Sequence, residues 1–240
     1  MSTLANRPVP VQRHQGPHLG ALAIAFTVLF CAGLYPVTWF SGRPFFPGPW
    51  APASEIAAFF QQRPGATLLC AFLQFGSAIP LGIFTATAVS RLEFFGVRAA
   101  GAKIALFGGF ATAFMMMTGA AVLWSMVHPV VAKDVPLTAA LYYLGFLIGG
   151  PGYAVSFGLL MAGLSVPLFF RKVVPRWIPM FGLVLALCGE LSWLNIEFPR
   201  ALLLVPLTRF PGFVWIIAVG FALPSTMKQT RETKAASATE

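Results

Sequence analysis

Six long apolar runs constrain this chain more than any other feature. About 20 apolar residues in a helix suffice to cross a hydrocarbon core of about 30 Å. Within that core every backbone amide and carbonyl must be bonded inside the protein, and a helix achieves this within one segment. We therefore predict an all-α, polytopic membrane helical bundle with six transmembrane helices, over about residues 19–40, 65–90, 104–128, 137–170, 177–197 and 210–224.

The two ends of the chain differ from the six runs. Residues 1–18 and 225–240 are polar and hold nothing that could bury a core, so we expect two flexible tails. The first apolar run is longer than the roughly 7–15 apolar residues of a signal peptide, and further spans follow it. We therefore treat it as the first helix of the transmembrane domain, which covers residues 19–224.

Charge sets the expected orientation. The chain has 16 Lys and Arg residues against 7 Asp and Glu residues, and the basic residues fall in short clusters between the apolar runs. That distribution is typical of topology signals and argues against nucleic-acid binding. Eleven of the 16 lie on the side of the tails and five on the other side. By the positive-inside rule we expect both termini to be cytoplasmic, in a multi-pass protein of a plasma membrane.

Two segments break the pattern of plain spans. The loop over residues 41–64 is rich in proline and aromatic residues, and Ile56, Phe59 and Phe60 share one face of a short helix within it. This pattern indicates either a lid over an external cavity or an anchor at the membrane interface. The fourth run is interrupted by Gly149, Gly150, Pro151 and Gly152, which predict a kinked or broken helix.

A carboxyl group deep in the fifth run is the leading candidate for function. Glu190 lies roughly 10 Å below Glu197, and Gln74 lies about 14 Å below the same outer surface, at 1.5 Å per helical residue. An acidic residue at membrane depth is costly unless it is neutral, paired or facing a polar cavity. Further polar groups share this outer half and complete the candidate pocket: His128, Tyr142 and Arg209.

Two interpretations of these residues stay open. In the first, a pocket open to the outer side binds a small molecule or a proton at Glu190, with Gln74 as its partner, above the helix break at residues 149–152. The protein would then be a small-molecule transporter or a sensor. In the second, Glu190 is a neutral acid or pairs with Arg209 and only locks helix packing, as in a structural or assembly protein.

No motif of catalysis, metal binding or phosphate binding occurs in the chain. The three cysteines lie in apolar runs without CxxC spacing, which indicates packing residues. We expect no cofactor and do not favour an enzyme; a lipid-modifying enzyme would have only His128 and Glu197 to work with. The bilayer is the one partner that the sequence implies. The sequence does not indicate the oligomeric state.

The C-terminal third carries a resemblance. Residues 174–187 read VPRWIPMFGLVLAL, and residues 203–223 read LLVPLTRFPGFVWIIAVGFAL. Arg176–Trp177 before one helix, and Arg209 to Gly212 followed by Trp215 in the next, resemble the closing two helices of a group of small uncharacterised bacterial integral membrane proteins, classed as domains of unknown function. The resemblance covers about a quarter of the chain and implies a six-helix bacterial membrane protein, without an activity or a site.

Overall fold

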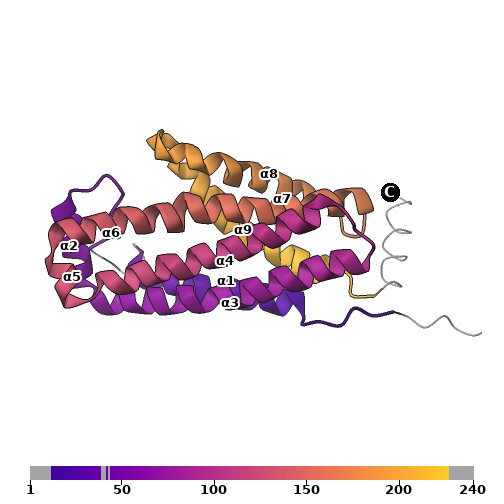
Figure 1. The fold of residues 1–240 in the computed structure, drawn as a ribbon, viewed down its shortest axis with the longest axis horizontal. Coiled ribbons are helices and arrows are strands. Elements are labelled where there is room, and N and C mark those ends of the chain that lie inside the picture. Colours follow the sequence, from indigo (N-terminus) through magenta and orange to yellow (C-terminus); the bar gives the residue numbers. More distant parts are fainter. Residues whose placement is uncertain (1–11, 39–41, 43, 227–240) are drawn as a thin grey trace, which may run out of the picture.

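The computed structural model describes residues 12–38, 42 and 44–226. Most of the two expected flexible tails, residues 1–11 and 227–240, therefore lies outside the described residues. Residues 12–18 pack against the bundle, and Arg13 forms an antiparallel bridge with Thr226. The ends of the described chain thus lie together at one end of the molecule, which we call the tail end; α2 and α5 lie at the other end, the loop end (Figure 1).

The described chain is helical, and six of its helical segments are long and apolar enough to cross a membrane, as predicted. Three of the six are single or nearly single helices: α1 (Leu19–Leu34) with η1 (Tyr35–Val37), α3 (Pro64–Phe94) and α4 (Ala100–Met126). The others are composite: α6 (Val135–Leu147), η3 (Ile148–Gly152) and α7 (Tyr153–Arg171); α8 (Trp177–Leu191) with η4 (Ser192–Ile196); and η5 (Pro199–Leu203) with α9 (Leu204–Ala222). Two short helices complete the described part, α2 (Ala53–Gln62) and α5 (Pro129–Lys133).

The six spans form a closed ring in chain order. Each span packs against the next, from α1 and α3 through α4 and α7 to α8 and α9, and α9 returns to pack against α1. Except between α1 and α3, where α2 intervenes, short connections between neighbouring antiparallel spans favour this order. A ring of six leaves an interior between the spans, and a cavity lined by residues of five spans lies in it.

Glycines let the helices of the ring approach closely. A Cβ atom built on Gly163 of α7 would lie 2.4 Å from the backbone nitrogen of Ala105 in α4. One built on Gly220 of α9 would lie 3.0 Å from the Cα of Gly20 in α1. Because lipid is as apolar as the helices, association in a membrane depends on such close packing of small residues. The Gly20–Gly220 contact closes the ring at the tail end.

The predicted interruption of the fourth span is a π-helical turn. Residues Ile148–Gly152 form η3, which joins α6 to α7 within one continuous helical segment, so the backbone is widened and not unwound. Pro151 lies inside this turn and has no amide to donate, which a wider turn accommodates. The carbonyl of Gly149 is one of the groups that the turn leaves accessible to a side chain.

The sixth span begins earlier than expected. The sequence placed its start near residue 210 because of Pro206, Arg209 and Pro211, but α9 starts at Leu204 and η5 extends the segment to Pro199. Pro206 is the third residue of α9, within the first turn of the α-helix, where proline is tolerated. As a result, Arg209 lies inside the span and not at its entrance.

The loop end carries a small core of its own. Ile56, Phe59 and Phe60 of α2 are fully or nearly fully buried, as their shared face predicted. They pack with Val37, Cys70, Met126 and Tyr142. The helix begins at Ala53, after Pro52, and no side chain caps it. The face of α2 therefore covers the α3 and α6 side of the ring at the loop end.

Candidate functional site

An interior cavity lies in the half of the ring nearer the loop end. Its volume is about 410 Å³, within the range of roughly 300–1,000 Å³ of small-molecule sites. Five of the six spans line it, and α8 contributes nothing. Its walls are mainly apolar, from Phe30, Leu34, Met115, Met116, Leu123 and Met126. The polar groups that reach it are few, which makes each of them informative.

Arg209 is the charged group of this cavity. It lies 10 residues after the start of the span Pro199–Ala222, roughly 15 Å along it at 1.5 Å per residue, and so near the middle of a bilayer core. Its guanidinium carbon lies 4.7 Å from the ring centre of Tyr153 and 5.5 Å from that of Phe30. One Nη donates a hydrogen bond to the carbonyl of Gly149 in the π-helical turn.

These contacts hold Arg209 without neutralising it. Cation–π contacts and a carbonyl stabilise a guanidinium, but they leave its positive charge in place. Its Nε is buried without a hydrogen-bond partner among the described residues. Over residues 12–38, 42 and 44–226 the only ion pair is Lys103–Glu93, at 2.7 Å. The cavity therefore contains a cation at membrane depth with no anion beside it.

Two further polar side chains line the cavity. Gln74 of α3 is buried, and its Nε2 donates to the carbonyl of Phe30 at 3.2 Å, which ties α3 to α1. Tyr142 of α6 is buried, and its hydroxyl donates to the carbonyl of Pro47 at 2.5 Å, which ties α6 to the loop before α2. The Gln74 carbonyl oxygen and the Arg209 guanidinium are thus the groups that can turn to a ligand.

An aromatic plug separates this cavity from the tail end of the ring. Phe30 packs against Tyr153 with ring centres 5.7 Å apart and against Phe213 at 5.0 Å. Phe26 and Phe157 continue the cluster on the side of the tail end. All five rings are buried. Any passage through the ring along its axis would require these rings to move.

The structure brings together some of the residues that the sequence singled out, and not others. Gln74, Tyr142, Arg209, Gly149 and Gly150 line the one cavity. The other two residues of the helix break, Pro151 and Gly152, belong to the same π-helical turn but do not line the cavity.

Glu190 lies apart from this cavity, on α8 against α7. A Cβ atom on Gly158 would lie 3.1 Å from its Oε1, so the carboxyl group rests in the groove between the two helices. Oε1 is buried and has no hydrogen-bond partner among the described residues. The ion pair with Arg209 that was one interpretation of Glu190 is not formed.

His128 and Glu197 also lie away from the cavity. His128 is exposed at the loop end, where its ring stacks edge-on against Trp124 with centres 4.3 Å apart. Glu197 is exposed at the end of η4. In the described part of the chain, no three His, Cys, Asp or Glu side chains come close enough together to hold a metal ion.

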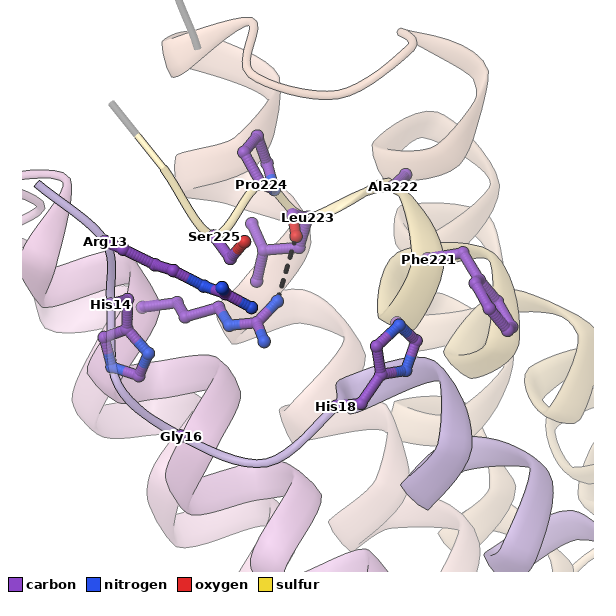
Figure 2. Close-up of a pocket in the computed structure, with 11 residues that line it drawn as sticks. Arg13, His14, Gly16, His18, Phe221, Ala222, Leu223, Pro224 and Ser225 are labelled. Carbon is purple, nitrogen blue, oxygen red and sulfur yellow. Dashed lines mark hydrogen bonds between the residues drawn. The ribbon is translucent and has the colours of Figure 1, made fainter. Parts of the chain in front are cut away.

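A second cavity, at the tail end, was not foreseen from the sequence. It has a volume of about 390 Å³ and is lined by the basic residues Arg13, His14, His18 and Arg91, together with residues 220–225 (Figure 2). The sequence placed Arg91 in a loop, but α3 continues to Phe94 and Arg91 is buried in it. Its partners lie 74 and 132 residues away in the chain, so local sequence carried no signal.

Comparisons of the chain with protein-family models, with curated proteins and with solved structures find no match. The resemblance to a group of bacterial membrane proteins stays a prediction.

Proposed function

We propose that this integral membrane protein binds a small organic anion, a monocarboxylate with an apolar body, in the cavity around Arg209, and that it serves as a transporter or a sensor for that molecule. We further propose that it lies in a plasma membrane with both termini in the cytoplasm. The loop-end cavity would then open to the outer side.

One observation carries this proposal: the Arg209 guanidinium lines an apolar cavity at membrane depth without a carboxylate beside it. Ionisable residues at such depth face cavities and mark ligand or ion pathways. An Arg fork matches a carboxylate with two parallel hydrogen bonds. One cation balances one negative charge, which favours a monoanion over a phosphate dianion. The surrounding Met, Leu and Phe side chains suit an apolar body.

Binding can be tested on the detergent-solubilised full chain by isothermal titration with hexanoate, using empty micelles as the blank. Hexanamide tests whether the charge is needed, and hexylamine tests the opposite charge. We expect hexanoate to bind and the two control compounds not to bind. Binding of hexylamine in place of hexanoate would overturn the anion site and favour a cation site at Glu190.

The matched variants are Arg209→Gln and Arg200→Gln. Arg200 belongs to the same span but is exposed and does not line the cavity. A charge-assisted hydrogen bond contributes about 1.5–3 kcal/mol, so Arg209→Gln should weaken hexanoate binding about tenfold or more, while Arg200→Gln leaves it unchanged. A folded Arg209→Gln protein that binds hexanoate as well as the wild type would refute the role of Arg209.

Transport and sensing differ in flux. Hexanesulfonate stays charged at accessible pH and does not leak through lipid as a neutral acid, so its uptake into proteoliposomes reports the protein alone. A transporter should accumulate it, with loss of uptake in Arg209→Gln. A sensor should bind without flux, because the plug of Phe26, Phe30, Tyr153, Phe157 and Phe213 stays closed.

The structural alternative has its own support. Arg209 already joins α9 to the π-helical turn and stacks on two rings, and a residue of that kind can serve packing alone. A purely structural Arg209 predicts no binding of hexanoate to the wild type, and a loss of thermal stability in Arg209→Gln.

A further inference from the structure

The tail-end cavity is a basic pocket built from three parts of the chain. The segment before α1 provides Arg13, His14 and His18; α3 provides Arg91; and the end of α9 with the residues after it provides the opposite wall. Figure 2 shows Arg13 extending from the N-terminal segment into the pocket, with His18 on the other side next to Phe221. His14 lies beside α3, where its Nε2 is 2.9 Å from the Oγ of Ser90. The pocket uses none of the residues around Arg209 and lies at the other end of the ring.

Arg91 fixes the pocket. Its side chain is 6% exposed, although it is charged. One Nη donates to the carbonyl of Leu223 at 3.1 Å, the dashed line in Figure 2, and the other donates to the carbonyl of Pro17 at 3.2 Å. A guanidinium has five N–H groups, and Nε is buried without a partner among the described residues. The structure thus places a desolvated cation here that still has donors to spare.

The segments around Arg91 are tied together. The amide of His14 donates to the carbonyl of Ser225 at 2.8 Å, and Arg13 pairs with Thr226 in an antiparallel bridge. Gly20 and Gly220 bring the ends of α1 and α9 into contact. The pocket is therefore held in shape by backbone contacts across the two ends of the described chain.

Nothing acidic balances this pocket in the described part of the chain. No Asp or Glu lines it, and the nearest carboxylate along α3, Glu93, is paired with Lys103 at 2.7 Å. Arg13 and Arg91 lie close enough for their charges to repel each other. Burial, together with the charge of Arg91, lowers the pKa of His14. A bound anion would stabilise this uncompensated positive charge.

The types of donor indicate which anion. Two guanidinium groups offer more N–H donors than a carboxylate can accept, and together they suit the charge and the three free oxygens of a phosphate group. His18 adds a donor: its Nδ1 accepts from the amide of Ala21 at 3.1 Å, so a neutral ring carries its proton on Nε2. The N-terminus of the 16-residue helix α1 starts beside the pocket, and its dipole favours a negative charge.

We propose that the tail-end pocket binds a phosphate group, held by Arg13 and Arg91 with His18, and carried either by an anionic lipid headgroup or by a soluble phosphate compound. Phe221 at the rim is 59% exposed and stacks edge-on against His18 with ring centres 5.5 Å apart. An exposed ring at the end of a span lies where acyl chains begin, so a headgroup can reach the pocket from the bilayer.

The test uses the full chain in phosphatidylcholine nanodiscs. In one arm phosphatidic acid replaces part of the lipid, and in the other inorganic phosphate is titrated into the buffer. Binding is read as retained lipid in native mass spectrometry or as a rise in unfolding temperature. If the ligand is a lipid headgroup, we expect selective retention of phosphatidic acid and no effect of inorganic phosphate. If it is a soluble compound, we expect inorganic phosphate to raise the unfolding temperature in a saturable way.

The variants are Arg13→Gln and Arg176→Gln. Arg13 has an exposed side chain, so its replacement keeps the Arg91 bonds that hold the pocket together, and Arg176 is an exposed arginine that does not line the pocket. We expect Arg13→Gln to weaken phosphate binding about tenfold and Arg176→Gln to leave it unchanged. If neither phosphate source binds, or if both variants bind like the wild type, the pocket is only a clamp between chain ends and the proposal fails.

Discussion

Replacing Gly163 by alanine tests whether the ring depends on close contact between α4 and α7. The added Cβ would lie 2.4 Å from the nitrogen of Ala105, 2.8 Å from its Cα and 2.6 Å from the carbonyl oxygen of Gly101. All three are backbone atoms of α4, so no side chain can rotate away. An ordinary contact needs about 3.5 Å, so the two helices must separate by about 1 Å over this crossing.

Overpacking of a well-packed core typically costs 1–3 kcal/mol, and a backbone obstacle places this variant near about 3 kcal/mol. For a chain of this size that corresponds to a fall of roughly 6–12 °C in unfolding temperature. The matched control is Gly76→Ala in α3, where a Cβ meets nothing within 4 Å; removing a helical glycine there should stabilise by up to about 1 kcal/mol.

Both variants can be compared with the wild type by fluorescence-detected thermal unfolding in one detergent. We expect the unfolding temperature to fall in Gly163→Ala and to rise in Gly76→Ala. A Gly163→Ala protein that unfolds at or above the temperature of the wild type would mean that α4 and α7 are not packed at this distance, and the ring order would have to be reconsidered.

Three further predictions concern single side chains. Phe157→Ala, within the aromatic plug, should cost about 3–5 kcal/mol of stability. Phe114→Ala, at a ring that is 63% exposed, should cost far less. Equal losses of unfolding temperature in the two variants would contradict a packed plug. Tyr142→Phe leaves the carbonyl of Pro47 without its donor and should lower the free energy of unfolding by about 1–2 kcal/mol. Tyr143→Phe, at the exposed neighbour, should leave it unchanged. If neither variant changes stability, the hydrogen bond does not hold the loop. Burial and the nearby guanidinium of Arg91 lower the pKa of His14, so as pH falls through about 6.5 the unfolded state binds the proton first and stability decreases. In phosphate-free buffer, His14→Gln should therefore lose less unfolding temperature than the wild type between about pH 7.5 and 5.5. An unchanged pH profile would contradict this.

The fold could be predicted from the sequence because the bilayer imposes length and polarity on every span. The six apolar runs and the order of loops followed from that constraint alone. What it could not supply was local backbone geometry. Pro206 and Pro211 look like helix breakers, yet the first falls within the first turn of α9, where proline is tolerated. The glycines and proline of residues 148–152 look like a break, yet a π-helical turn accommodates them.

For the site, the sequence predicted the depth of each residue in the membrane but not the direction in which its side chain faces. Counting residues along each span placed Gln74, Tyr142 and Arg209 in one half of the bundle, and the structure arranges them around one cavity. Counting does not give the direction in which a residue faces within the ring, so it could not place Glu190 in the groove between α7 and α8. The pocket at Arg91 depends on contacts across 74 and 132 residues, which the ring creates and local sequence does not encode.

The pairing of Arg209 with the carboxylate of a ligand can be measured directly as a distance. Solid-state NMR on reconstituted protein with nitrogen-labelled arginine and carboxyl-labelled hexanoate reports dipolar coupling between the two labels. We expect a coupling that corresponds to about 4 Å, present in the wild type and in Arg200→Gln and absent in Arg209→Gln. Bound hexanoate without such a coupling, or with one that survives in Arg209→Gln, would contradict this pairing.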